Sequence, residues 1–429
     1  VKSITHPITF KEVKSLTHPN QIYRSVKSIT HPNQIYRSVK SITHPITFKE
    51  VVFGVRYPYL LISITRTSFK MMLTVAKTVA ATTTAGLAGF GIWVQRGLAA
   101  HRALVPTVAM ARARGELGEQ VDLPDGRKLG YLLPENFDPS GRVFVSIHGT
   151  PECRLANWLA HKYVAEHKHP GWMPALDYGK KRDKELGLQN VAIDRWGVGL
   201  SSFKGDGTIA DIGADIVALC DHLGVDKFMV SGGSGGGPYA AACAAVIDPA
   251  RLIGTCMMVP VGPKQLKKQG GNAAMRKMPD WQYTLAMLGM KMSFQRMTGE
   301  QFSAVVMNNP NMVESDKETA KERGDYMASC FRNSCYFQHG VAAAVEENRL
   351  LNEENFGFDR RDMGRTQILA AKADYNTPVE HAEWYAEGGS EQVELRTYEE
   401  KGHFSLFEDL DVLEEANQFF DACYRDHEM

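Results

Sequence analysis

The stretch Val230-Ser231-Gly232-Gly233-Ser234-Gly235-Gly236-Gly237 places Ser234 between glycines on both sides. It directly follows the apolar run Phe228-Met229-Val230, which is typical of a short strand, and precedes PYAAACAAVI at 238–247, which is typical of a buried helix. A chain that reverses from strand to helix within a few residues holds the residue at the turn exposed and strained, and flanking glycines leave room for such a turn. Ser234 is therefore our candidate nucleophile.

Glycine-rich loops also bind phosphates or simply connect elements, so other interpretations of Ser234 must be weighed. A phosphate-binding loop ends in Gly-Lys-Ser/Thr, and no lysine follows Ser234 before the helix. Gly197 and Gly199 follow another predicted strand, but a dinucleotide site needs a third glycine where this chain has Ser202. We therefore predict no nucleotide cofactor, and a purely structural glycine turn stays the alternative to a nucleophile.

A second motif lies upstream of the serine, where the strand pattern at 142–147 ends in His148-Gly149-Thr150-Pro151. Such a turn can direct a backbone N–H toward the oxygen that becomes negative during attack on a carbonyl group. Thr150 is the residue placed to supply one donor. Gly235, the residue after the candidate nucleophile, would supply the second donor of this oxyanion hole.

Two further candidates lie downstream of the serine. Asp374 closes the apolar run at 367–373, and His403 follows the strand pattern at 393–398. Asp374 could instead be a helix N-cap, and His403 could be one of 14 ordinary histidines. Together with Ser234 they give the chain order Ser, Asp, His, in which the aspartate would orient the imidazole and the imidazole would act as general base.

These motifs resemble those of the α/β-hydrolase superfamily, in its branch with a helical lid. The resemblance covers about residues 121–424 and rests on the motifs His148–Pro151, Asp194–Ser201, the Ser234 turn, Asp374–Pro378 and Gly402–His403. It implies a mostly parallel, doubly wound α/β sheet with a lid insertion, a catalytic triad of Ser234, Asp374 and His403, and no cofactor.

The chain departs from that family pattern at two positions. Glu152 follows the His-Gly-x-Pro turn where the family often has a small residue, and Trp196 stands where it often has proline. Glu152 could narrow the choice of substrate or could point to solvent.

The composition divides the chain into five parts. Residues 1–70 are repetitive, residues 71–115 form a hydrophobic and basic segment, 116–262 and 364–429 form the hydrolase core, and 263–363 form the lid. Repeats this short and this exact cannot build a shared core, so we expect the first part to be disordered or a gene-model extension. These repeats begin at Val1, Val13, Val26 and Val39.

The hydrophobic and basic segment at 71–115 allows more than one cellular location. Residues 78–94 are uncharged and flanked by Lys77 and Arg96, but they are rich in Thr, Gly and Ala, which makes them a marginal membrane span. Residues 51–115 contain no Asp or Glu, which also fits a mitochondrial presequence or a plain amphipathic tail. We expect an intracellular protein, either anchored to a membrane by this segment or mitochondrial.

Composition and charge narrow the other function classes. With 429 residues and 44% hydrophobic residues the chain can bury one large core, and a net charge of zero gives no argument for nucleic acid. A solvated loop explains His161, His167 and His169 better than a metal site, because such sites need three or four converging ligands. An odd number of scattered cysteines predicts buried free thiols: Cys153, Cys220, Cys243, Cys256, Cys330, Cys335 and Cys423.

The insertion at 263–363 is mostly helical in pattern. Trp281, Leu285, Leu288 and Met292 recur at helical spacing, so we expect them to form the core of the lid. A minority of the apolar residues there should line an acyl pocket above the nucleophile, because a lid must exclude water from the reacting carbonyl group.

The predicted function is hydrolysis of a small or medium carboxylic ester through an acyl-enzyme. Two alternatives stay open. The first is an aminopeptidase of the proline-iminopeptidase type, which would need an acidic group such as Glu152 or Glu300 to hold the substrate ammonium. The second is a small-molecule receptor that retains the triad but turns over little.

Overall fold

A computed structural model describes residues 118–155, 181–294, 296–333 and 341–428. The repetitive segment, the segment at 78–94, the histidines at 161–169 and Cys335 lie outside these residues, and the burial of Cys330 stays a prediction. Within the described part, no helix combines the length and the apolar character that a membrane span requires.

One eight-stranded sheet organises this part of the chain, with the strand order β1-β2-β4-β3-β5-β6-β7-β8. β1 pairs antiparallel with β2 and β2 pairs antiparallel with β4, whereas all later pairings are parallel. The predicted α/β class with a mostly parallel sheet is confirmed. The strands are β1 (Glu119–Asp122), β2 (Lys128–Leu132), β3 (Arg142–Ile147), β4 (Leu188–Ile193), β5 (Phe228–Gly233), β6 (Leu252–Met258), β7 (Thr366–Ala371) and β8 (Val393–Tyr398).

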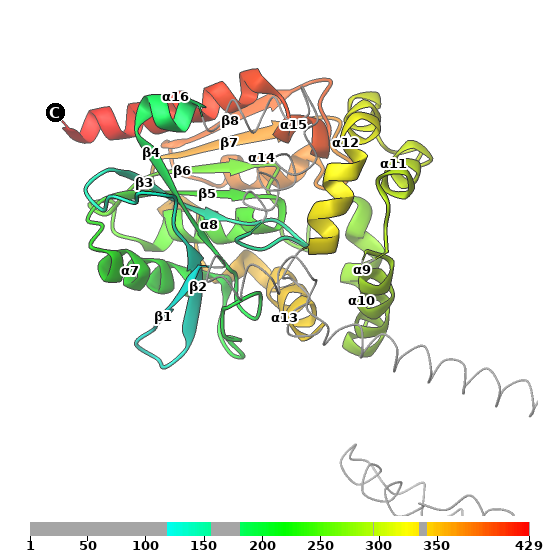
Figure 1. Cartoon of the computed structure of the whole chain (residues 1–429), viewed down its shortest axis with the longest axis horizontal. Helices are drawn as coiled ribbons and strands as arrows, with labels where there is room; N and C mark the ends of the chain where they lie inside the picture. Colours follow the sequence, from blue (N-terminus) through cyan, green and yellow to red (C-terminus); the bar gives the residue numbers. More distant parts are fainter. Residues whose placement is uncertain (1–117, 156–180, 295, 334–340, 429) are drawn as a thin grey trace, which may run out of the picture. The chain divides into compact units, whose positions relative to one another are not determined.

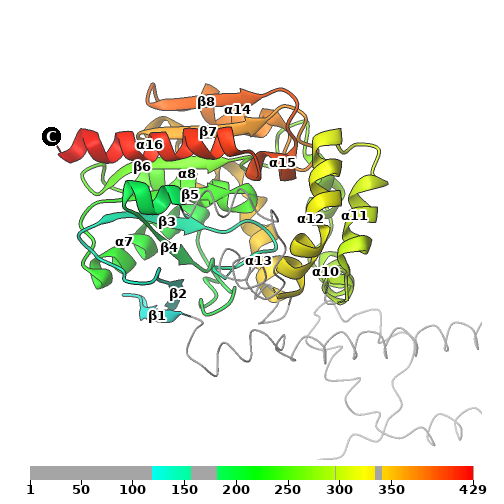
Figure 2. The same cartoon turned by 45° about the horizontal axis from the view of Figure 1, so that its top comes forward.

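Helices cover both faces of this sheet (Figure 1, Figure 2). The helices of the core are α7 (Ile212–Leu223), α8 (Gly237–Val246), α14 (Val379–Glu387), α15 (His403–Phe407) and α16 (Leu410–Glu428). α7, α8 and α14 share one hydrophobic cluster on one face, and α16 packs on the other face.

The two-residue period of the strands explains how both faces are filled. In β3, Val143, Val145 and Ile147 join the cluster of α7, α8 and α14, while Phe144 joins the α16 cluster and stacks on Phe420 at 5.2 Å between ring centroids. Successive side chains of a strand point to opposite faces, so a strand that is apolar throughout is buried on both. Because the strands from β4 to β8 in the sheet order pair in parallel, their carboxyl ends meet at one edge of the sheet.

The expected helical insertion lies between β6 and β7. It contains α9 (Ala273–Arg276), α10 (Asp280–Phe294), α11 (Gly299–Met307), α12 (Glu314–Asn333) and α13 (Ala342–Leu351). α10 and α13 pack against Cys153, Leu155 and Val198 in the loops that follow β3 and β4. The role of the insertion as a lid stays a prediction.

One detail of the predicted insertion core is wrong. Trp281 is 64% exposed rather than buried, whereas Leu288 is buried as expected, together with Tyr283 and Met287. Leu285 is partly buried against the same cluster, so Trp281 at the start of the helix is the residue that departs from the expected face. Five cysteines are buried free thiols, as predicted: Cys153, Cys220, Cys243, Cys256 and Cys423.

Candidate active site

Ser234 lies at a sharp turn between β5 and α8. Its φ is +50°, in the left-handed region that non-glycine residues rarely adopt, so the backbone at this serine is strained. The flanking glycines make the turn possible, because any larger residue would add a Cβ atom for which there is no room. A Cβ at position 232 would lie 2.5 Å from the carbonyl oxygen of Gly236, and a Cβ at position 236 would overlap the carbonyl oxygen of Ile147. The predicted strand-turn-helix context of Ser234 is therefore confirmed.

His403 and Asp374 form a buried pair. The imidazole Nδ1 lies 2.8 Å from Asp374 Oδ2, and the aspartate side chain is fully buried. Asp374 Oδ1 accepts hydrogen bonds from the backbone N–H groups of Asn376 and Thr377 at 2.7 and 2.9 Å. The carboxylate therefore fixes the turn before α14 and also holds the imidazole. It is not the N-cap of α14, because Pro378 occupies that position and the helix has no side-chain cap.

Opposing influences act on the pKa of His403. Burial alone would lower it, but the charge of Asp374 and its hydrogen bond to the ring act in the opposite direction, and Asp316 and Glu152 add to them. The net result is a pKa above the ordinary value of 6.5. Such an imidazole readily holds the proton that a general base must accept.

Phe407 connects the serine turn to the histidine. A Cβ on Gly233, the residue before Ser234, would lie 2.9 Å from the Phe407 ring, and the centroid of that ring is 5.9 Å from the centroid of the His403 ring. Among the described residues no hydrogen bond joins the Ser234 hydroxyl to the imidazole. Their alignment for proton transfer therefore stays a prediction.

The turn after β3 lies against the turn after β5. A Cβ on Gly235 would overlap Thr150 Oγ1, and one on Gly149 would lie 3.4 Å from Ser234 Cβ. The two residues expected to supply oxyanion donors are thus adjacent, beside the serine.

A buried ion pair lies behind these two turns. Arg195, 2% exposed, is paired with Glu347 of α13. Its guanidinium donates to the carbonyl oxygen of Gly149 at 3.0 Å, to that of Gly235 at 3.3 Å and to Thr150 Oγ1 at 3.0 Å. Thr150 Oγ1 in turn donates to Glu347 at 2.6 Å. Arg195 and Glu347 therefore hold both candidate oxyanion turns through one charged network.

His148 is part of the same network as a neutral ring. Burial and the nearby charge of Arg195 place its pKa well below 6.5. Its Nε2 accepts from the Arg195 backbone N–H at 3.0 Å, so Nδ1 carries the proton and donates to the Gly149 carbonyl oxygen at 2.8 Å. The two hydrogen bonds of this histidine stabilise the turn after β3, and the ring does not act as a second base.

The strand order, together with the position of each site residue, decides the fold. The candidate nucleophile follows β5, the acid follows β7 and the histidine follows β8, all at the carboxyl edge of a sheet whose antiparallel strands are confined to its beginning. The chain has the α/β-hydrolase fold. The sequence had implied this only through a resemblance.

The chain is similar to known proteins in structure and not in sequence. No protein-family profile matches the chain, and no curated protein matches it in sequence. Among solved structures, an esterase from Exiguobacterium antarcticum is 16% identical, with 73% of this chain and 100% of that chain covered and a TM-score of 0.44. An α/β hydrolase fold protein from Nakamurella multipartita is 17% identical, with 71% and 99% covered and a TM-score of 0.48. At such identities the likeness concerns the fold alone.

Glu152 lies beside Ser234, the candidate nucleophile. Its Oε2 accepts a hydrogen bond from the Gly149 N–H at 3.2 Å, and a Cβ on Gly149 would lie 3.4 Å from both this oxygen and Ser234 Cβ. Desolvation raises the pKa of Glu152 against the lowering effects of the Gly149 amide, Arg195 and His403. The side chain thus turns back toward the site. Glu300, the other candidate acid, is exposed in α11.

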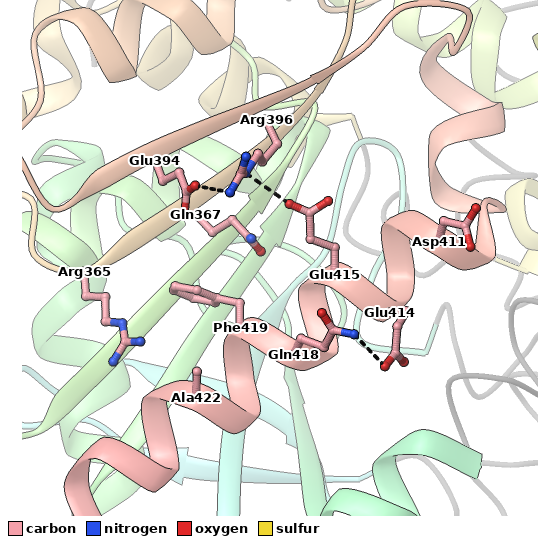
Figure 3. A pocket seen from close by; sticks show the side chains of 10 residues that line it. All are labelled: Arg365, Gln367, Glu394, Arg396, Asp411, Glu414, Glu415, Gln418, Phe419 and Ala422. Carbon is pink, nitrogen blue, oxygen red and sulfur yellow. Dashed lines mark hydrogen bonds and ion pairs between the residues drawn. The ribbon is translucent and has the colours of Figure 1, made fainter.

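An open groove of about 570 Å³ lies elsewhere on the fold, and none of the candidate catalytic residues lines it. Figure 3 shows Arg396 of β8 between Glu394 and Glu415, and Gln418 beside Glu414 on α16. Four carboxylates and two arginines line the groove, and two of these carboxylates, Glu394 and Glu415, pair with Arg396. Because no candidate catalytic residue lines it, the groove is separate from the candidate active site.

Sequence reasoning missed two members of the site. Arg195 stands in the motif Asp194–Ser201, which supports the resemblance but gives this arginine no role, and its position directly after a strand is the available signal. Glu347 had no signal, because acidic residues in a helix usually face solvent.

Proposed function

We propose that the chain is a serine hydrolase that cleaves a small or medium carboxylic ester through an acyl-enzyme. The strained Ser234 at the carboxyl end of β5 carries this proposal most directly. Support comes from the buried His403–Asp374 pair and from the adjacent Thr150 and Gly235 turns.

In the first step His403 Nε2 takes the proton of Ser234 while Oγ attacks the ester carbonyl carbon. Asp374 holds Nδ1–H and stabilises the imidazolium, and the N–H groups of Thr150 and Gly235 stabilise the oxyanion. The tetrahedral intermediate then collapses, the C–O bond to the alcohol breaks, and the imidazolium gives its proton to the leaving oxygen.

In the second step a water molecule replaces the alcohol. His403 takes a proton from this water, whose oxygen attacks the acyl carbon, and the second collapse returns the proton to Ser234 Oγ and releases a carboxylic acid. Each oxyanion donor contributes about 100- to 1000-fold to turnover in hydrolases of this chemistry, so the backbone turns matter as much as the triad.

Ser234→Ala tests the proposal with a short p-nitrophenyl ester as substrate. We expect hydrolysis to fall to the background rate, because no other hydroxyl replaces the nucleophile. Ser293→Ala, an exposed serine of α10, is the matched control and should retain full activity. Undiminished hydrolysis by Ser234→Ala would remove this serine from the mechanism.

The aminopeptidase alternative is favoured by one observation, the carboxyl group of Glu152 beside the nucleophile. A carboxylate there could hold the ammonium group of an N-terminal residue. Parallel kcat/KM measurements on acyl esters and on aminoacyl amides distinguish the two functions, and the ester function predicts a preference for the first set. Sustained multiple turnover on either set would exclude a receptor without turnover.

A further inference from the structure

The first turn of α12, within the insertion, meets the loop that carries His403. The Asp316 side chain is completely buried there. Its Oδ2 accepts from the backbone N–H of His403, and its Oδ1 accepts from the backbone N–H groups of Phe404 and Ser405, all at 2.9 Å. Ser405 Oγ adds a fourth hydrogen bond to Oδ1 at 2.9 Å. One carboxylate of the insertion thus binds the backbone at the candidate general base and at the two residues after it.

Neighbouring contacts reinforce this attachment. Ser315 Oγ donates to the carbonyl oxygen of Glu400 at 2.7 Å and lies 3.0 Å from Ser405 Oγ. A Cβ on Gly402 would overlap the Asp316 carboxylate, so only glycine leaves room for this approach. α12 and α15 lie side by side in both views of the fold (Figure 1, Figure 2).

We propose that Asp316 is a positioning residue for the general base, through which the inserted helices fix the imidazole of His403 relative to Ser234. This inference rests on the proposed function and deepens it. The backbone at 403–405 is fixed by charge-assisted hydrogen bonds from outside the core sheet, and such bonds are stronger than neutral ones. The insertion is then part of the catalytic framework as well as a cover.

The charge of Asp316 also acts on the imidazole. Three carboxylates from three different elements face His403: Asp374 after β7, Asp316 on α12 and Glu152 after β3. All three raise the pKa of His403, against the lowering effect of its burial. Replacing Asp316 by a neutral residue must therefore lower this pKa, whereas a purely structural role would leave it in place.

Asp316→Asn tests this role, because the amide keeps one acceptor oxygen but loses the charge and presents an N–H group to another donor. Glu318→Gln is the matched control, since Glu318 is an exposed acid on the same helix. We expect kcat on the p-nitrophenyl ester to fall about 10- to 100-fold, with KM little changed, because a small misplacement of a catalytic group costs that much.

NMR titration gives a readout that does not depend on hydrolysis. The His403 signal is identified as the one that His403→Gln removes, and we expect its pKa to move down in Asp316→Asn and to stay unchanged in Glu318→Gln. The acid limb of kcat/KM should move to lower pH by the same amount. The inference fails if a folded Asp316→Asn protein keeps both the His403 pKa and the kcat of the control.

Ser405→Ala covers the case in which Asp316→Asn does not fold. It removes the hydrogen bond from Ser405 Oγ to Asp316 and the one from the Gly402 N–H to Ser405 Oγ at 2.9 Å, but it keeps the charge. We expect a several-fold lower kcat at an unchanged His403 pKa, and a wild-type kcat would overturn the inference. Failure of the proposed function is distinguishable, because then Ser234→Ala would retain the hydrolysis of the wild-type protein.

Discussion

Asp374 Oδ2 lies 2.8 Å from His403 Nδ1 and also accepts a hydrogen bond from Thr377 Oγ1 at 2.8 Å. The threonine hydroxyl is 3.2 Å from the same ring nitrogen. Since Asp374 Oδ1 is bound by two backbone N–H groups, both oxygens of the carboxylate are fixed. The ring therefore carries its proton on Nδ1 and leaves Nε2 free to act as a base.

Replacing this carboxylate by an amide should disable the base. In Asp374→Asn the amide can hold the imidazole in the wrong tautomer, and we expect kcat to fall about 10⁴-fold, as for the corresponding change in serine proteases. Asp362→Asn, at an exposed acid before β7, should leave kcat unchanged. A folded Asp374→Asn protein within tenfold of wild-type kcat (on the order of 1 kcal/mol) would contradict the role of Asp374.

The pH dependence of kcat/KM should report His403. A base must be neutral to accept a proton, so activity is lost as the pH falls through the His403 pKa, and we expect this limb above pH 6.5. Glu152→Gln removes a neighbouring negative charge and should move the limb to lower pH. Glu135→Gln, at an exposed acid, should not move it. A limb well below pH 6.5 in the wild-type protein would argue against the charged environment described above.

Gly235→Ala should damage the oxyanion turns. The added Cβ would overlap Thr150 Oγ1, so one of the two turns must shift. We expect kcat to fall about 100-fold or more, the usual effect of losing one oxyanion donor, with a smaller effect on KM. At Gly364 an added Cβ would lie 3.7 Å from its nearest neighbour, so Gly364→Ala should keep wild-type kinetics. Equal kinetics of the two variants would show that the turn tolerates the shift.

Glu347→Gln should lower the free energy of unfolding. Removing the charge leaves the buried Arg195 guanidinium without its carboxylate, and breaking a buried pair in this way typically costs about 3–5 kcal/mol. Chemical denaturation would measure this loss against Glu354→Gln, an exposed acid that should cost little. A loss below about 1 kcal/mol would show that Arg195 finds other acceptors.

The sequence predicted the strands and the order of the site residues because both follow from local patterns. Buried parallel strands are apolar throughout, and the turns after them carry the polar residues. β1 was not predicted, because a four-residue edge strand with the sequence Glu-Gln-Val-Asp buries only Val121. β5 extends to Gly233, beyond its apolar residues, because the glycines still pair with β6.

The charged residues that support the site could not be predicted in the same way. Asp316 and Glu347 lie in helices whose acidic residues are typical of solvated faces. Each is buried only because a partner distant in the sequence meets it, the backbone at 403–405 for Asp316 and the Arg195 guanidinium for Glu347. Such pairs depend on how the insertion packs on the core, and local periodicity does not contain that information.

The most direct test of the account is active-site labelling with a fluorophosphonate probe, combined with steady-state ester hydrolysis by the same preparation. We expect one probe per chain, attached to Ser234 in the peptide identified by mass spectrometry, and loss of multiple-turnover hydrolysis in proportion to labelling. Hydrolysis that persists after Ser234 is fully labelled, or a probe attached to another residue, would contradict the account.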